Sequence, residues 1–160
     1  MDRTGIIVKG IGGFYYVLTE GEIVECKARG LFRKEGITPM VGDEVKLAQD
    51  IDLIEEILPR KNRLLRPAVA NIDYLGIVIA PRDPVPDYLL VDKMIVFACM
   101  QDIEPIIIIN KIDIANQLDM DKIIDIYRDT GWQVFPVSCV TGEGINDLSY
   151  AFSGGITTPK

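Results

Sequence analysis

The sequence predicts two folded units, a small β-barrel of the OB-fold type over residues 1–66 and part of an α/β parallel sheet over residues 67–160. Three observations predict this division: short strands with turns in the first part, longer apolar strands alternating with helices in the second, and a basic, proline-bracketed segment between them. The charge changes at nearly the same place. Residues 1–67 carry eleven basic and eleven acidic side chains, whereas residues 68–160 carry six and thirteen and so account for the whole net charge of −7.

The first unit consists of candidate strands separated by turns, over residues 5–9, 14–18, 22–28, 43–47 and 52–58. Several of them alternate apolar and charged residues, as half-buried strands do. Short strands at this spacing fit a closed barrel, for which the OB-fold is the obvious candidate. The glycine-rich segment 10–13 is not a dinucleotide fingerprint, because no helix follows it; we expect a turn or bulge there.

The second unit follows a predicted linker over residues 59–71, which Pro59 and Pro67 bracket. Buried strands and helices then alternate. The predicted strands are residues 74–80, 104–109 and 132–137, and the predicted helices are residues 87–100, 121–130 and 145–152. This alternation predicts a parallel sheet, in which ligands bind at the carboxyl ends of the strands.

The composition excludes several classes of function. The chain has no histidine, which excludes Ser-His-Asp and Cys-His catalysis and histidine metal sites. We assign no catalytic residue and no metal ligand within these residues. The cysteines Cys26, Cys99 and Cys139 are odd in number and far apart, which predicts reduced thiols in a cytoplasmic protein. No apolar run reaches membrane-spanning length and no signal-peptide pattern begins the chain, so we expect no membrane partner.

The clearest binding motif follows the second predicted strand of the sheet. Residues 110–113 are Asn-Lys-Ile-Asp, the pattern with which GTPases recognise guanine. Asp113 can accept hydrogen bonds from guanine N1–H and the 2-amino group, whereas adenine offers neither donor. Charge-assisted bonds of this kind contribute about 1.5–3 kcal/mol each. Asn110 can offer its amide to N7, and the stem of Lys111 can lie flat over the base.

A second motif follows the next predicted strand. Residues 138–144 are Ser-Cys-Val-Thr-Gly-Glu-Gly, and the main-chain N–H of Cys139 can donate to guanine O6. Val140 stands where lysine is usual and so loses one packing contact over the base. The segment 73–76 also matches an Asp-x-x-Gly magnesium motif, but it enters a strand instead of following one, which favours a structural role. The predicted guanine site is therefore Asn110, Lys111, Asp113, Ser138, Cys139 and Val140.

Two basic clusters in the first part of the chain predict RNA contacts. They comprise Lys27, Arg29, Phe32, Arg33 and Lys34, and then Arg60, Lys61, Arg63 and Arg66. Cations for phosphates with an interleaved aromatic side chain suit RNA. Two solvated surface loops explain the same pattern equally well. Because the barrel has no net positive charge, its affinity for free RNA should be modest and salt-sensitive.

The order of these features resembles one family, the circularly permuted GTPases of small-ribosomal-subunit biogenesis known as RsgA, YjeQ or YloQ. The resemblance spans essentially the whole chain and rests on residues 5–17, 29–34, 39–43, 66–73, 110–113 and 138–144. It implies GTP or GDP as the ligand and the small ribosomal subunit with its rRNA as the partner. We also expect a monomer.

The sequence contains no Gly-x-x-x-x-Gly-Lys-[Ser/Thr] phosphate loop. In the family that loop, the switch regions and a zinc module follow the guanine motifs, and residues 152–158 resemble the strand that leads into the loop. We therefore expect the front part of such a protein, with Mg²⁺ and structural Zn²⁺ bound only beyond it and no GTP hydrolysis by this chain alone. Two other interpretations stay open: a stand-alone RNA-binding or regulatory module with a degenerate nucleotide site, and a nucleotide-independent α/β protein with a chance motif.

Overall fold

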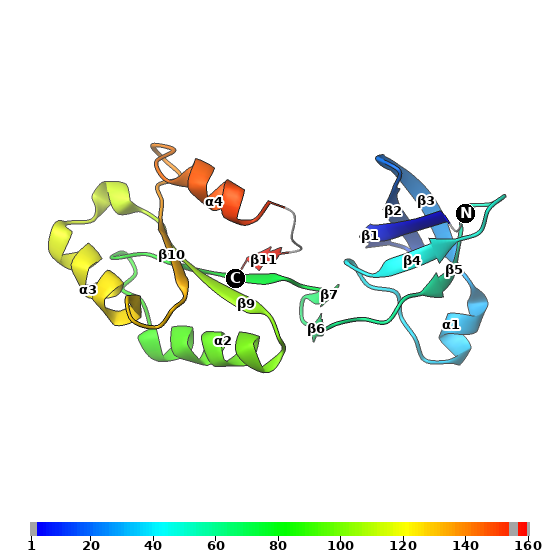
Figure 1. Ribbon diagram of the computed structural model, residues 1–160, viewed down its shortest axis with the longest axis horizontal. Helices are drawn as coiled ribbons and strands as arrows, with labels where there is room; N and C mark the ends of the chain where they lie inside the picture. Colours follow the sequence, from blue (N-terminus) through cyan, green and yellow to red (C-terminus); the bar gives the residue numbers. More distant parts are fainter. Residues whose placement is uncertain (1–2, 154–156, 160) are drawn as a thin grey trace. The chain divides into compact units, whose positions relative to one another are not determined.

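The computed structural model describes residues 3–153 and 157–159 (Figure 1). The chain divides into two compact units, Met1–Ile72 and Asp73–Lys160. Within the described residues, no helix combines the length and the apolar character that crossing a membrane requires.

In the described residues of the first unit, five strands close into a barrel. The strands are β1 (Arg3–Ile11), β2 (Phe14–Thr19), β3 (Glu22–Ala28), β4 (Glu44–Leu47) and β5 (Leu53–Ile57). Their order around the barrel is β1-β2-β3-β5-β4, and β4 pairs with β1 to close it. A short helix, α1 (Gly30–Lys34), lies between β3 and β4 in the chain. A closed barrel of five short strands is the architecture of an OB-fold, so the predicted fold class of this unit is confirmed.

The barrel core comes from the inward residues of each strand. Ile7, Val17, Val45 and Ile54 are completely buried and pack together with Phe32 from α1. The alternation along β2 is typical of a strand with one buried face: Val17 is buried, whereas its neighbour Leu18 is exposed.

The β1–β2 connection is a two-residue turn. Gly12 and Gly13 both have positive φ, of 60° and 87°, and the flanking residues Ile11 and Phe14 pair with each other. This is the conformation that a tight hairpin requires and that glycine adopts without strain. The turn predicted for residues 10–13 is therefore present.

Most of the segment predicted as a linker is ordered within the first unit. β6 (Arg63–Leu65) and β7 (Ala68–Ala70) form an antiparallel hairpin, and Val69 forms a bridge with Val41. Asn71 holds the hairpin to the barrel, because its Nδ2 donates to the Gly42 carbonyl at 2.9 Å and its Oδ1 accepts from the Lys61 N–H at 2.9 Å. Side-chain amides in this segment thus replace water as partners of the main chain.

The second unit contains a parallel sheet in the order β10-β9-β8-β11. Its strands are β8 (Tyr74–Ile79), β9 (Glu104–Ile109), β10 (Gln133–Pro136) and β11 (Thr157–Pro159). β11 overlaps the end of the stretch 152–158 that was predicted as a further strand, and residues 154–156 of that stretch lie outside the described residues. The helices are α2 (Tyr88–Met100), α3 (Gln117–Tyr127) and α4 (Ile145–Ala151). The parallel α/β prediction is confirmed.

Helices cover both faces of this sheet (Figure 1). α2 packs against β8 and β9. On the other face, Ile145 and Leu148 of α4 pack on Ile106 and Ile108 of β9. Because successive strand residues face opposite sides, β9 must be apolar on both faces wherever helices cover it, which explains the run of isoleucines at residues 106–109.

Candidate functional site

The loops that follow β8, β9 and β10 begin at the same edge of the sheet. The main-chain N–H of Asn110 donates to the Ile79 carbonyl at 2.8 Å, and the N–H of Val137 donates to the Ile109 carbonyl at 2.8 Å. These bonds extend the sheet by one residue past each strand. Residues 80–87, 110–116 and 137–144 therefore gather at the carboxyl ends of the strands, where parallel sheets bind ligands.

The 110–113 loop is held by its own side chains. Asn110 Oδ1 accepts from the N–H of Lys111 at 2.8 Å, and Lys111 adopts a left-handed conformation with φ of 67°. Lys111 Nζ donates to the Asp83 carbonyl at 2.7 Å. Asp113 lies in a 3₁₀ turn, η1 (Ile112–Ile114), and is exposed. The loop thus presents an amide, an aliphatic stem and a carboxylate.

Ser138 joins the two predicted motifs. Its Oγ donates to Asp113 Oδ1 at 2.6 Å, and it accepts from the N–H groups of Val140 at 3.3 Å and Thr141 at 3.1 Å. The Ser138 side chain is fully buried. One hydroxyl therefore fixes both the orientation of the carboxylate and the start of the 138–144 loop.

Cys139 provides the second link between the motifs. Its main-chain N–H donates to Asn110 Oδ1 at 3.2 Å. The Cys139 N–H, which we predicted to be available for guanine O6, therefore already has a partner in the 110–113 loop. Cys139 and Val140 are both exposed. The two loops together bring all the predicted guanine-site residues to one edge of the sheet.

Two glycines shape the 138–144 loop. Gly142 and Gly144 have φ of 83° and 72°, and a Cβ on Gly144 would stand 2.1 Å from the Pro136 carbonyl oxygen, whereas a Cβ on Gly142 would meet nothing within 4 Å. The Ser138 N–H donates to the Glu143 carbonyl at 2.9 Å, and the Gly142 N–H donates to the Ser138 carbonyl at 2.8 Å. Gly144 is therefore required for close packing of the loop against β10.

We expect Gly144→Ala to destabilise the second unit more than Gly142→Ala does. Both substitutions strain a left-handed residue, at about 1–2 kcal/mol, but only Gly144→Ala also forces a methyl group into a main-chain carbonyl. Urea unfolding followed by the fluorescence of Trp132, the single tryptophan of the chain, measures the free energy of unfolding of this unit. Equal losses for the two variants would contradict the packing role of Gly144.

The loop after β8 was not part of the predicted site. A largely apolar cavity of about 700 Å³ adjoins Asn110 and Lys111 and is also lined by Pro84, Val85 and Met94. Arg82 ties the loop to α3 through an ion pair with Asp119. The signal available in the sequence was the run of prolines at residues 81, 84 and 86, directly after a buried strand. In the described part of the chain, no three Cys, Asp or Glu side chains come together as metal ligands.

The first predicted basic cluster is only partly a cationic surface. Lys27 Nζ lies 5.4 Å from the centroid of the Phe14 ring, and Arg29 pairs with Glu55 at 3.0 Å. Lys34 is exposed, and the side chain of Arg33 lies outside the described residues. Phe32 differs from the prediction of an exposed aromatic, because it is 8% exposed and packs in the barrel core.

The second predicted basic cluster contains one structural arginine. Arg60 Nε and Nη2 donate to the two oxygens of Asp43 at 2.6 and 2.8 Å, and Nη2 also donates to the Thr38 carbonyl at 2.8 Å. Asp43 is completely buried, and its hydrogen bonds to Arg60 raise the pKa of the guanidinium above its usual value. Arg60 is thus committed to the barrel, whereas Lys61, Arg63 and Arg66 are exposed.

An aromatic and cationic surface that the sequence motifs did not identify lies on the outside of the barrel. Phe14 is 38% exposed beneath Lys27, and Lys9 Nζ lies 5.1 Å from the Tyr16 ring centroid. The register places Lys9 opposite Tyr16 and Phe14 opposite Lys27 across adjacent strands. The alternation of residues 14–18 was the signal that could have identified Phe14 and Tyr16 as outward-facing.

Two family models match the chain, the RsgA N-terminal domain over residues 4–52 and the RsgA GTPase over residues 57–158. The chain is 50% identical over 147 residues to the small ribosomal subunit biogenesis GTPase RsgA of Caldanaerobacter subterraneus subsp. tengcongensis, covering 90% of this chain and 50% of the relative. It is 44% identical over 163 residues to the protein of the same name from Ruminiclostridium cellulolyticum, covering 97% of this chain and 53% of the relative. The chain spans about half the length of these curated relatives.

Solved structures show the same fold. YjeQ from Thermotoga maritima matches with a TM-score of 0.90 and 32% identity, over 99% of this chain and 60% of that one. YloQ, described as a circularly permuted GTPase, matches with a TM-score of 0.85 and 34% identity, over 99% of this chain and 59% of that one. The resemblance predicted from the sequence motifs is confirmed. The chain therefore belongs to the RsgA family of circularly permuted GTPases.

Proposed function

We propose that this chain carries the guanine-recognition part of a GTPase that acts in maturation of the small ribosomal subunit. The observation that supports this most directly is the hydrogen bond from Ser138 Oγ to Asp113 Oδ1 at 2.6 Å, which joins the two guanine motifs at the ligand-binding edge of the sheet. The similar proteins from Caldanaerobacter subterraneus and Ruminiclostridium cellulolyticum are named small ribosomal subunit biogenesis GTPase, which supports a role in maturation of that subunit.

Each side chain has a distinct role in this proposal. Asp113 accepts from guanine N1–H and the 2-amino group, and Ser138 holds the carboxylate in place. Lys111 covers one face of the base with its aliphatic stem, whose end is held by the Asp83 carbonyl. The Cys139 N–H exchanges its bond to Asn110 Oδ1 for one to guanine O6, while the Lys111 N–H still holds Asn110 Oδ1 and Asn110 Nδ2 donates to N7. When guanine binds, the site loses one long internal hydrogen bond, from the Cys139 N–H to Asn110 Oδ1, and gains several hydrogen bonds to the base.

We propose that these residues bind guanine nucleotides without hydrolysing GTP. Phosphoryl transfer depends on groups that grip the phosphates and Mg²⁺, and the phosphate-loop pattern that supplies them is absent from the printed sequence. The described residues offer no group of three or more Cys, Asp or Glu side chains for a metal ion. Mg²⁺ and structural Zn²⁺ would belong to residues outside this sequence.

Titration with GDP and ADP tests the guanine site. We expect weak GDP binding, because the phosphates lack a loop to hold them, and no ADP binding, because adenine would place an acceptor against the Asp113 carboxylate. Main-chain NMR shifts of Cys139 and Val140 report binding at the site, and release of phosphate from GTP should stay at the level of a buffer control. Equal shifts with ADP and GDP, or steady phosphate release, would contradict this part of the proposal.

We also propose that the barrel binds rRNA of the small subunit, as part of a monomeric cytoplasmic protein. What supports the RNA contact is the set of exposed cations on the first unit, Lys27, Lys34, Lys61, Arg63 and Arg66. Co-sedimentation of the chain with purified small subunits tests the contact. The alternative, an RNA-binding module with a degenerate nucleotide site, predicts the same co-sedimentation but no response to GDP.

A further inference from the structure

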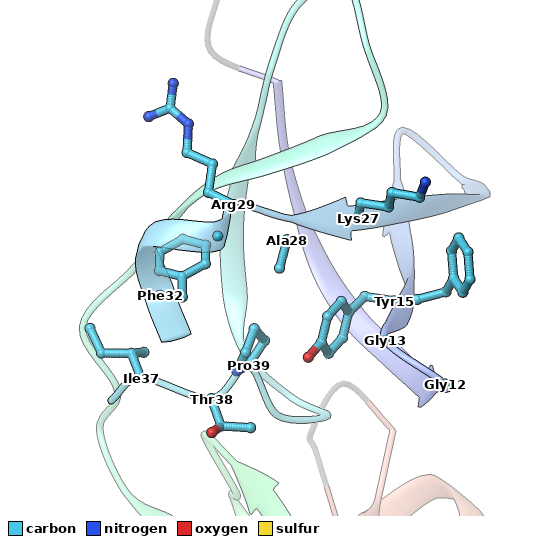
Figure 2. A pocket seen from close by; sticks show the side chains of 12 residues that line it. Gly12, Gly13, Tyr15, Lys27, Ala28, Arg29, Phe32, Ile37, Thr38 and Pro39 are labelled. Carbon is cyan, nitrogen blue, oxygen red and sulfur yellow. The ribbon is translucent and has the colours of Figure 1, made fainter. Parts of the chain in front are cut away.

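A cavity of about 640 Å³ opens at one end of the barrel (Figure 2). It lies among the β1–β2 turn, the end of β3, α1 and the segment that precedes β4, all within the first unit. Pockets that bind small ligands have volumes of about 300–1,000 Å³. The cavity is therefore large enough to hold a planar ring system with its attached sugar.

The charge of the cavity wall favours an anionic ligand. Its lining residues include Lys27 and Arg29 and no carboxylate. A neighbouring cavity of about 480 Å³ differs in this respect, because three carboxylates, Glu35, Glu55 and Glu56, line it against one cation, Arg60. In a chain with a net charge of −7, a hollow whose two charged lining residues are both cations is a local exception. Of these two cavities, the first has the positively charged rim that would attract phosphates.

An aromatic ring forms one wall of the same cavity. Tyr15 packs against the barrel core and is half-buried, and Figure 2 shows its ring between Gly13 and Pro39. The neighbouring Phe14 stands at the rim, where its ring lies under Lys27 Nζ and holds this cation beside the cavity. Rings and cations in this arrangement suit a nucleotide, whose base stacks and whose phosphate carries charge.

The β1–β2 turn leaves the cavity open. A Cβ on Gly12 or Gly13 would meet nothing within 4 Å, so the main chain of the turn forms a bare edge. In OB-folds, this loop and the face of the second and third strands contact oligonucleotides. The edge can therefore admit a chain that enters the cavity with one base and continues over the strands.

We propose that this cavity binds one unpaired base of single-stranded RNA, which stacks on Tyr15 while the adjoining phosphates contact Lys27 and Arg29. The inference rests on the RNA-binding function proposed above and adds the class of ligand and the place where it binds. Arg29 exchanges its exposed ion pair with Glu55 for a phosphate, at little cost because exposed pairs contribute little.

The test compares two RNA probes that carry the same phosphates. One is a single-stranded oligoribonucleotide of about eight nucleotides, within the roughly 4–16 nucleotides that an OB-fold covers. The other has the same length but no bases. Fluorescence anisotropy of the full 160-residue chain should show about 5- to 100-fold weaker binding of the probe without bases, since stacking of one base contributes on this order.

Three variants locate the effect. Gly30 lines the cavity and a Cβ there would meet nothing within 4 Å, so Gly30→Phe fills the space without a clash and should weaken binding of the base-containing probe about as much as removing the bases does. Lys27→Gln should weaken binding of both probes. Lys93→Gln is the matched control, because Lys93 is exposed on α2 of the second unit and does not line the cavity, and removing its charge should leave binding of both probes unchanged. Circular dichroism verifies that each variant folds.

Equal affinity for the two probes, or a folded Gly30→Phe variant that binds as tightly as the parent chain, would overturn the base-binding cavity. If co-sedimentation with small subunits persists in that case, the proposed RNA function stands and the contact lies elsewhere. If the parent chain binds neither probe and does not co-sediment, both the cavity and the RNA function fail.

Discussion

Replacing Asp113 by asparagine should exchange guanine for xanthine as the base that this chain prefers. The carboxylate of Asp113 accepts two charge-assisted hydrogen bonds from guanine in the proposed site, and losing them should weaken GDP binding by about 10²–10⁴-fold, at about 1.5–3 kcal/mol each. Xanthine keeps N1–H but has a carbonyl at C2. Ser138 Oγ, which donates to Asp113 Oδ1 at 2.6 Å, can donate to the amide oxygen instead and leave Nδ2 to bind that carbonyl.

The measurement is a titration of parent and variant with GDP and xanthosine diphosphate, by calorimetry or by the main-chain shifts of Cys139 and Val140. Asp147→Asn is the matched control, because Asp147 is an exposed acid in the first turn of α4 and lies outside the two motifs. It removes the same charge from the same unit and should leave the preference for GDP intact. An Asp113→Asn variant that still selects GDP would show that Asp113 does not contact the base.

The sheet and the location of the guanine motifs could be predicted from local pattern alone. β9 needs apolar side chains on both faces, so its isoleucine run identifies a buried parallel strand. A motif directly after such a strand must lie at its carboxyl end, and the same holds for Ser138 after β10. The two motifs therefore had to meet, and the Ser138–Asp113 hydrogen bond is the contact between them.

The roles of Phe32 and Arg60 could not be predicted, because each depends on a partner distant in sequence. Phe32 lies between Arg29 and the adjacent cations Arg33 and Lys34, which suggests a surface position, but α1 turns its ring into the barrel core. Arg60 belongs to a cluster of cations in the sequence, whereas in the fold it forms an ion pair with the buried Asp43. The local sequence pattern shows the chemical character of a side chain, but it does not show which distant residue the side chain will contact in the fold.

The segment 59–71 shows a related limit. Its prolines and polar residues suit an exposed linker, yet the same amides support ordered structure. Asn62 Nδ2 donates to the Ile72 carbonyl at 2.8 Å, and Asn62 Oδ1 accepts from the Ile72 N–H at 2.7 Å. A side-chain amide that pairs with the main chain resembles one that pairs with water until the fold is known.

Removing Arg60 should cost the barrel far more than removing a neighbouring arginine. Arg60→Ala leaves the carboxylate of Asp43, which is 0% exposed, without its cation, and breaking a buried ion pair from one side costs about 3–5 kcal/mol. The Met40 N–H, which donates to Asp43 Oδ2 at 2.7 Å, cannot replace the charge. Arg63→Ala is the control, since Arg63 is exposed on β6 and exposed positions usually change stability by less than about 0.5 kcal/mol.

Urea unfolding measures this difference with two signals. Far-UV circular dichroism follows both units, while the fluorescence of Trp132 follows the second unit alone, so a loss confined to the barrel shifts the first signal and not the second. Small domains have only about 5–15 kcal/mol of stability, so the loss removes a large share of the stability of the barrel. Any loss of RNA binding in Arg60→Ala would then follow from unfolding, whereas Arg63→Ala would lose binding while remaining folded if Arg63 contacts phosphate. Equal stability of the two variants would contradict the structural role of Arg60. The earlier prediction that Arg60 contacts RNA would then stand.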